Sequence, residues 1–283
     1  MTRRIAFAAI AIPAAVAIIW VGGWLLTALL MVAAALGAGE LFHLAERNGI
    51  KPLRAVGIVA AVLPVLLLQL VLQWPIRFQW ALATPMVMIA AFMIIFGIAT
   101  FTRAPQERPL EVVAVTLFGA MYTGVLPASA FMIRHARWST DSWTGTAVLF
   151  LPMIVIWICD SAAMFAGRMI GGAKLAPTIS PNKTWAGSIA GSVVGTIAGV
   201  IYALAIFPRL AIDTPIIAIA LLALAVTVIG QIGDLAESVL KREAGVKDSS
   251  ALIPGHGGVL DRLDSLYFVL PAAAIGYHLI GLT

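Results

Sequence analysis

Four polar stretches interrupt a chain that is otherwise strongly apolar, and all four lie in its second half. The first is 160–168, where a helix would place Asp160 and Arg168 on one face. Asp160 directly follows the apolar segment 154–159, and a carboxylate beside lipid costs enough free energy to indicate a functional site. The alternative is a structural ion pair between Asp160 and a nearby Lys or Arg.

The second stretch, 180–187, combines hydroxyl groups with a lysine. Ser180 followed by Pro181 predicts the N-cap and first position of a helix, so we expect a helix to begin here. A helix N-terminus that carries Lys183 and Thr184 suits phosphate, because its free N–H groups and dipole favour an anion. The simpler alternative is a well-capped membrane helix whose lysine reaches toward the interface.

The third stretch, 231–242, places Asp234 and Ser238 on one predicted helical face together with two cations, Lys241 and Arg242. A carboxylate with a hydroxyl is a hard oxygen donor set, which suits Mg²⁺ or Ca²⁺ and not zinc. The alternative is a solvated charged face at the end of a helix.

The fourth stretch, 247–264, is rich in glycine around a single histidine. Glycines such as Gly257 and Gly258 let the backbone approach a ligand closely and offer N–H groups to phosphate. Asp261 and Asp264 share a face if the last helix has already begun there. A lone histidine is more often a structural hydrogen-bond donor than a catalyst.

Together the four stretches supply both carboxylates and cations. Carboxylates that hold a divalent metal, with cations and glycine N–H groups around them, are typical of a site for a nucleotide or pyrophosphate. The carboxylates are Asp160, Asp234, Asp261 and Asp264, and the cations are Lys183, Lys241, Arg242, Lys247 and Arg262.

The segment 238–264 resembles the signature of the phosphatidate cytidylyltransferases, or CDP-diacylglycerol synthases. The matching residues are Ser238-Val-Leu-Lys241-Arg242, then Lys247-Asp248, then Pro254-Gly-His256-Gly257-Gly258-Val-Leu-Asp261-Arg262-Leu-Asp264. A pattern with so many fixed positions is specific, and this chain does not depart from it. The likeness extends over about residues 150–265, whereas the first 140 residues match only as apolar helices.

The resemblance implies a nucleotidyltransferase of phospholipid biosynthesis. CTP and phosphatidic acid would give CDP-diacylglycerol and pyrophosphate at a Mg²⁺-dependent site, with one or two metal ions, at the membrane face. It also implies a homodimer, as is frequent in the family. By this likeness Asp234 and Asp261 are the expected metal ligands, assisted by Asp160 or Asp264.

This chemistry suits the residues. The attacking phosphate monoester is already anionic at neutral pH, so it needs relief from repulsion near the α-phosphate of CTP more than it needs a base. His256 either assists the pyrophosphate leaving group or only shapes its loop. The candidate catalytic residues are Asp234, Asp261, Lys247, Arg262 and His256, and the candidate substrate-binding residues are Ser180, Lys183, Thr184, Ser238, Lys241, Arg242, Gly257 and Gly258.

Two other functions stay open from the sequence. The cytidylyl acceptor could be another lipid phosphate, because the sequence does not show the pocket for the lipid backbone. A transporter or channel would place its acids near the membrane midplane and often contains an inverted repeat, whereas here the polar groups gather in loops and no repeat is visible. The spaced Asp-Gly…Ala-Arg…Asp…Asp pattern of CDP-alcohol phosphotransferases is absent.

The elements that must position these groups are membrane-spanning helices. Hydrophobic residues make up 61% of the chain and charged residues 11%, and the mean hydropathy is +1.02, so polar residues are too few to cover a water-soluble globule. In lipid only helices and closed barrels satisfy the backbone. Long, continuous apolar runs select helices, and we predict an all-α polytopic membrane protein.

Nine apolar segments are candidate spans, each needing about 20 residues. The short sixth segment would continue as a helix to about residue 169. Lys and Arg concentrate on one side if the N-terminus is cytoplasmic, which puts the four polar stretches on the cytoplasmic side of the cell (inner) membrane, where CTP is available. The segments are 5–21, 23–37, 55–73, 79–99, 110–133, 146–159, 186–207, 214–230 and 265–281.

The chain changes character near residue 140. Residues 1–140 have short, bland loops and are expected to anchor the protein and face lipid, whereas residues 141–283 carry the catalytic loops. The net charge of +5 is better explained by basic loops beside an anionic leaflet than by nucleic acid. The single cysteine, Cys159, excludes an intrachain disulfide.

Overall fold

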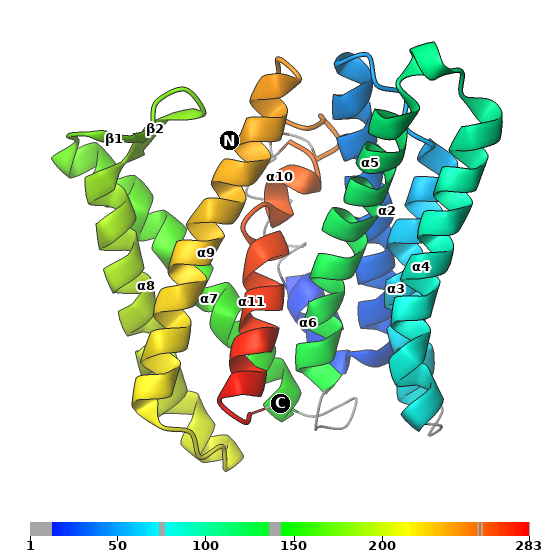
Figure 1. The fold of residues 1–283 in the computed structure, drawn as a ribbon. Helices are drawn as coiled ribbons and strands as arrows, with labels where there is room; N and C mark the ends of the chain where they lie inside the picture. Colours follow the sequence, from blue (N-terminus) through cyan, green and yellow to red (C-terminus); the bar gives the residue numbers. More distant parts are fainter. Residues whose placement is uncertain (1–12, 74–76, 136–142, 254, 256, 283) are drawn as a thin grey trace. The chain divides into compact units, whose positions relative to one another are not determined.

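The structure is a computed structural model that describes residues 13–73, 77–135, 143–253, 255 and 257–282. Figure 1 draws its helices and strands, coloured along the sequence. The chain divides into two compact units. Unit 1 contains Met1–Phe131 and Glu243–Arg262, and unit 2 contains Met132–Arg242 and Leu263–Thr283. The segment 243–262, which carries most of the glycine-rich stretch, therefore packs with the N-terminal helices. The predicted division at residue 140 stays a prediction.

Unit 1 is a bundle of helices that meet around one aromatic ring. Phe42 is fully buried, and a Cβ added at Gly57 or at Gly119 would overlap its ring. Glycine at these two positions lets three helices close on Phe42. The elements are α2 (Gly23–Arg47), α3 (Arg54–Gln73), α4 (Arg77–Thr102), the 3₁₀ turn η1 (Pro105–Glu107), α5 (Pro109–Ala120), the π turn η2 (Met121–Val125), the first part of α6 (Leu126–His135) and most of α10 (Leu260–Leu263).

Unit 2 is organised by the close packing of two helices, α7 (Trp143–Ile170) and α8 (Trp185–Ile206). A Cβ added at Gly191 of α8 would lie 2.7 Å from the carbonyl oxygen of Cys159 in α7, so only glycine permits this approach. The other elements are the antiparallel strands β1 (Lys174–Ala176) and β2 (Ser180–Thr184), the 3₁₀ turn η3 (Phe207–Leu210), α9 (Ile216–Glu243) and α11 (Leu266–Leu279).

Several helices extend well beyond the apolar runs that predicted them. Helix α7 reaches Ile170, which confirms the predicted continuation to about residue 169. The apolar segment 214–230 is followed by helix to Glu243 in α9, which agrees with the predicted helical face of 231–242, and the apolar segment 23–37 is followed by helix to Arg47 in α2. The reason is that intrahelical hydrogen bonding continues after the sequence becomes polar, whereas a predicted apolar segment ends where its apolar run ends.

The predicted helix start at Ser180 is wrong. Ser180 begins β2 and pairs with Ala176 of β1, and the helix begins only at Trp185. Thr184 is the N-cap: its backbone is extended and its Oγ1 accepts a hydrogen bond from the N–H of Gly187 at 3.1 Å. Pro181 is tolerated because this two-stranded sheet has only edge strands.

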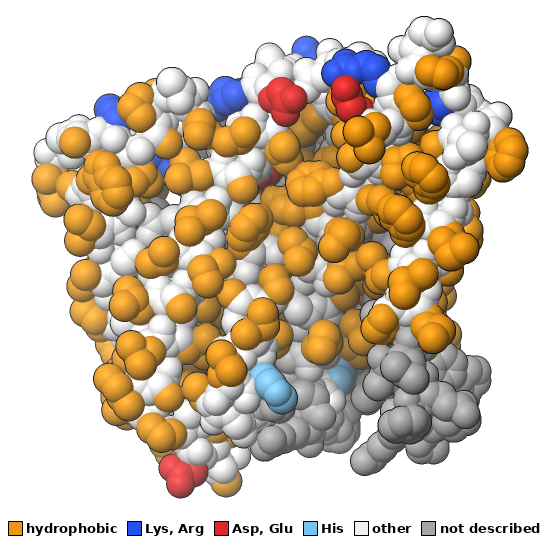
Figure 2. Space-filling model, in the orientation of Figure 1, with side chains coloured by type: hydrophobic (Ala, Val, Ile, Leu, Met, Phe, Trp, Pro, Cys, Tyr) orange, Lys and Arg blue, Asp and Glu red, His pale blue; other side chains and the backbone are white. Residues whose placement is uncertain are grey.

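The described residues include seven helical stretches that are long and apolar enough to cross a membrane, which makes this a multi-pass membrane protein. Hydrophobic side chains cover the flanks of these helices in Figure 2. The predicted count of nine spans is not confirmed: residues 5–12 of the first predicted segment lie outside the described residues, although 13–21 is helical, and α11 has only 14 residues. The orientation of the N-terminus stays a prediction.

Candidate active site

The glycine-rich loop of unit 1 is closed by Asp261, which lies in the first turn of α10 and is 7% exposed. Its Oδ2 lies 2.8 Å from each of three donors, the N–H and the hydroxyl of Ser249 and the N–H of Gly258. Asp261 thereby joins the two ends of the segment 249–258. The backbone N–H of Ile253 donates to the carbonyl of Gly257 within the same loop, at 2.8 Å.

Two of the loop's glycines make room for this carboxylate cluster. Gly257 has φ 81°, and a Cβ there would lie 2.6 Å from Oδ2 of Asp261. A Cβ at Gly258 would overlap both the Ser249 hydroxyl and the carboxylate of Glu40. The N–H of Gly258 already donates to Asp261, so this group does not point to a phosphate here. Phosphate binding by Gly257 and Gly258 stays a prediction.

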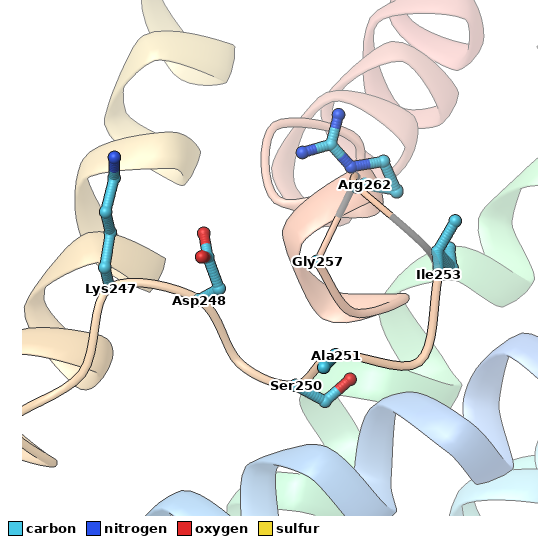
Figure 3. Close-up of a pocket in the computed structure, with 8 residues that line it drawn as sticks. Lys247, Asp248, Ser250, Ala251, Ile253, Gly257 and Arg262 are labelled. Atoms are coloured by element: carbon cyan, nitrogen blue, oxygen red, sulfur yellow. The ribbon is translucent and has the colours of Figure 1, made fainter. Parts of the chain in front are cut away.

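The loop borders a cavity of about 520 Å³, within the range of small-ligand pockets. Lys247 and Arg262 both line it, so the structure brings together two of the predicted phosphate-binding cations (Figure 3). Asp248 contributes one acid to the same wall. The lining residues are Lys247, Asp248, Ser250, Ala251, Ile253, Gly255, Gly257 and Arg262.

In unit 2 the hairpin brings Lys183 to Asp234 of α9. Nζ of Lys183 lies 2.7 Å from Oδ2 of Asp234, and both side chains are about one quarter exposed, at 26% and 27%. The hydroxyl of Ser238 lies one helical turn away and donates to Oδ1 of Asp234 at 3.4 Å. The predicted association of Asp234 with Ser238 on one face is therefore confirmed, and Lys183 joins them from β2.

A second carboxylate, Asp264, lies in the electrostatic field of Asp234. Burial, together with the negative charge of Asp234, raises the pKa of Asp264 to about 6. Its Oδ1 accepts a hydrogen bond from the N–H of Ser265 at 2.6 Å, which acts in the opposite direction. Asp160 of α7 is close enough for the charges of Asp234 and Asp264 to act on it as well. Lys183 therefore does not fully compensate the negative charge of this cluster.

These residues suit a hard divalent cation to different degrees. Asp160, Asp234 and Asp264 offer carboxylate oxygens in a field that a cation would relieve. Over the described part of the chain, no three His, Cys, Asp or Glu side chains form a ready metal cluster. Asp261 differs, because its Oδ2 is engaged by three donors. Metal ligation by all four aspartates stays a prediction.

Several predicted substrate-binding residues have partners within the protein. Lys241 is 8% exposed, and its Nζ lies 3.1 Å from Oε1 of the fully buried Glu237. Nε of Arg242 donates to the carbonyl of Ile179 at 3.1 Å. Thr184 is 3% exposed and caps α8. Phosphate binding by these side chains stays a prediction, and His256 lies outside the described residues.

One residue that the sequence analysis did not select belongs to this site. Glu40 of α2 is 7% exposed and lies against the glycine-rich loop, where Leu260 donates to it at 2.8 Å. Glu40 lies just after the predicted apolar segment 23–37, within the 140 residues that the sequence predicts to be an anchor. A lone acid among apolar residues was the available signal, the same signal that selected Asp160.

Comparison with known proteins gives a consistent assignment. The model of the cytidylyltransferase family matches residues 2–280. A phosphatidate cytidylyltransferase of Synechocystis sp. is 32% identical over 95% of this chain and 94% of its own, and that of Bacillus subtilis is 32% identical over 84% of each.

A phosphatidate cytidylyltransferase of Haemophilus influenzae is 40% identical over 54% of this chain, and the match spans about half of that relative's length, 53%. The family model and the Synechocystis relative, by contrast, extend over almost all of the chain. The chain therefore belongs to the cytidylyltransferase family.

Proposed function

We propose that this protein is a phosphatidate cytidylyltransferase, which transfers the cytidylyl group of CTP to phosphatidic acid and releases pyrophosphate. The observation that carries the proposal is the cavity of about 520 Å³ beside the glycine-rich loop, which Lys247 and Arg262 both line. Two cations at a polar cavity suit a polyphosphate. The names of the relatives, phosphatidate cytidylyltransferase, supply the acceptor.

In the proposed reaction a phosphate oxygen of phosphatidic acid attacks the α-phosphorus of CTP. The new P–O bond forms as the bond from the α-phosphorus to the bridging oxygen of the β-phosphate breaks, and pyrophosphate takes the electron pair. No proton transfer is required, because the nucleophile is already anionic. Lys247 and Arg262 would neutralise the charge on the phosphates and stabilise the leaving pyrophosphate.

Mg²⁺ is the proposed cofactor, and Asp234, Asp264 and Asp160 are its proposed ligands. A bound divalent ion would neutralise charge on the substrate phosphates. Asp234 now shares Oδ2 with Lys183, so ligation would leave the lysine available to a phosphate. For Asp261 we propose a role in shaping the glycine-rich loop ahead of a role in binding metal. Titration with Mg²⁺ would measure whether one or two ions bind.

Orientation and assembly complete the proposal. We place the N-terminus and the catalytic loops on the cytoplasmic side of the inner membrane, because that arrangement concentrates Lys and Arg inside and gives access to CTP. The acyl chains of the substrate would stay in the bilayer. A homodimer is proposed on the family likeness alone.

The test is pyrophosphate release by the detergent-purified protein with CTP, phosphatidic acid and Mg²⁺. We expect turnover that is abolished by chelation and falls about 100-fold in Arg262→Gln, since removing one preorganised charge contact costs about that much. Lys51→Gln, an exposed cation outside the pocket, should match the wild type. Turnover only with another lipid phosphate would change the substrate, and none with any lipid phosphate from folded protein would refute the proposal.

A further inference from the structure

Glu40 binds the glycine-rich loop through both oxygens of its carboxylate. Oε1 accepts from the hydroxyl of Ser250 at 2.7 Å and from the N–H of Val259 at 3.0 Å. Oε2 accepts from the hydroxyl of Ser249 at 2.9 Å and from the N–H of Leu260 at 2.8 Å. The donors lie on both sides of the loop's glycines, so one carboxylate of α2 fixes the start and the end of the loop.

Glu40 and Asp261 act on the loop from opposite sides of one hydroxyl. The Ser249 Oγ lies 2.9 Å from Oε2 of Glu40 and 2.8 Å from Oδ2 of Asp261. A hydroxyl has one proton, so it donates to one carboxylate at a time. Each carboxylate also receives backbone N–H groups, and these fix the positions of both independently of the hydroxyl. Ser249 therefore lies between two separately held acids.

The Glu40 carboxylate accepts its four hydrogen bonds from the loop. A buried carboxylate is costly unless hydrogen bonds compensate it, and here all four of these donors come from residues 249–260. Two of these hydrogen bonds relate Glu40 to the cavity. Ser250, which donates to Glu40, lines the cavity, and Arg262 lies only two residues after Leu260, whose N–H donates to Glu40. The side chain of Ser250 points toward the neighbouring helices in Figure 3.

We propose that Glu40 is a positioning residue, which holds the glycine-rich loop in the shape that brings Lys247 and Arg262 to one phosphate-binding cavity. It would not touch the substrate. Glutamine could not replace it, because an amide nitrogen cannot accept a hydrogen bond from a backbone N–H. The kinetic part of the test rests on the proposed function, whereas the part that measures loop order does not.

The test compares Glu40→Gln with Glu46→Gln, which removes an exposed acid of the same helix that pairs with Arg54 at 3.6 Å. Hydrogen–deuterium exchange of the segment 249–262 should quicken about 10-fold or more in Glu40→Gln and stay unchanged in Glu46→Gln, since hydrogen bonds to a charged group are lost. Glu40→Asp keeps a carboxylate and should recover part of the protection. Unchanged exchange in Glu40→Gln would overturn the proposal.

Kinetics separate positioning from a purely structural role. The KM for CTP should rise about 10-fold or more in Glu40→Gln, the loss expected when hydrogen bonds that orient a binding group are removed. The KM for phosphatidic acid should change less than about 2-fold, and Glu40→Asp should recover part of the CTP affinity. A structural role alone would lower the amount of active enzyme and leave both KM values unchanged, and that result would overturn the proposal.

Failure of the proposed function is distinguishable from failure of this inference. If the wild type shows no turnover, protection of 249–262 by Mg²⁺-pyrophosphate still reports phosphate binding by the loop. Protection in the wild type that is lost in Glu40→Gln would support the inference, and equal protection in both would overturn it. If Glu40→Gln does not fold, Ser250→Ala removes one donor to Glu40, and unchanged exchange of the segment would count against the proposal.

Discussion

Asp234 and Asp261 are equal candidates for metal ligation by residue type, and their surroundings differ. Asp234 is partly exposed and pairs with Lys183, whereas Asp261 is 7% exposed with three donors on one oxygen. Asp234 can therefore exchange Lys183 for another cation at little structural cost. Asp261 holds the glycine-rich loop together, so its substitution should affect the fold of this loop as well as the proposed reaction.

We expect Asp261→Asn to destabilise the protein, because the amide keeps one acceptor oxygen and puts a donor where backbone N–H groups now donate. The free energy of unfolding should fall by about 1.5–3 kcal/mol, the range for hydrogen bonds to a charged group. Thermal unfolding in detergent measures this. Asp234→Asn is the comparison and should lose activity with a smaller change in stability. Equal melting of Asp261→Asn and wild type would show that Asp261 does not secure the loop.

The raised pKa of Asp264 predicts that the stability of the protein depends on pH. Its pKa is raised to about 6 from 3.8, so the folded protein favours the neutral acid. The stabilising contribution is complete below the unfolded value near 3.8 and is lost as the pH rises through about 6. With chelator present, Asp264→Asn should therefore raise the melting temperature at pH 7.5 and leave it unchanged near pH 4. A melting temperature raised equally at both pH values would contradict the raised pKa.

At the scale of elements, local sequence patterns correctly predicted structure that depends on neighbouring residues. They failed where secondary structure depends on a partner strand elsewhere in the chain. The predicted continuation of α7 is right because a helix is locally hydrogen-bonded. The Ser180-Pro181 pattern indicated a helix start, but pairing of β2 with β1 prevails and Thr184 becomes the cap. The pairing depends on Lys174–Ala176, and no pattern within 180–187 reveals it.

The packing of α7 on α8 gives a prediction at this scale. In Gly191→Ala the new Cβ would lie 2.7 Å from the Cys159 carbonyl and 2.8 Å from the Cβ of Ala163, so the helices must separate. Overpacking of this kind costs about 1–3 kcal/mol. Gly97→Ala in α4 is the matched control, because nothing lies within 4 Å of its added Cβ. Equal unfolding of the two variants in a detergent titration would show that α7 and α8 can relax apart.

At the scale of the molecule, the sequence predicted the membrane helices and the cationic loop but not how the loop is held. Lys247 and Arg262 line one cavity, in agreement with their closeness along the chain. Glu40 lies 209 residues before Ser249, and no pattern within the sequence connects the two. Hydropathy alone also could not predict the number of spans, because α11 is apolar but has only 14 residues, fewer than a span needs.

Membrane orientation is the last property that the proposed function requires. If each of the seven candidate spans crosses the bilayer, we expect the loop at Lys51, between α2 and α3, and the loop at Asp213, between α8 and α9, to face opposite sides of the membrane. Each Lys or Arg near an anionic leaflet contributes about 1 kcal/mol, so the basic loop at Lys51 should be cytoplasmic. Cys159 is buried and is the only cysteine, so Cys159→Ala gives a background for single-cysteine labelling.

In that background we expect Asp213→Cys to react with an impermeant maleimide from outside the inner membrane, and Lys51→Cys to react only in inverted vesicles. The reverse pattern would put the end of α2 that carries Glu40, and with it the glycine-rich loop that Glu40 binds, on the outer side. CTP is a cytoplasmic nucleotide and does not cross the bilayer. The reverse result would therefore contradict the proposed reaction, whatever the purified protein does in detergent.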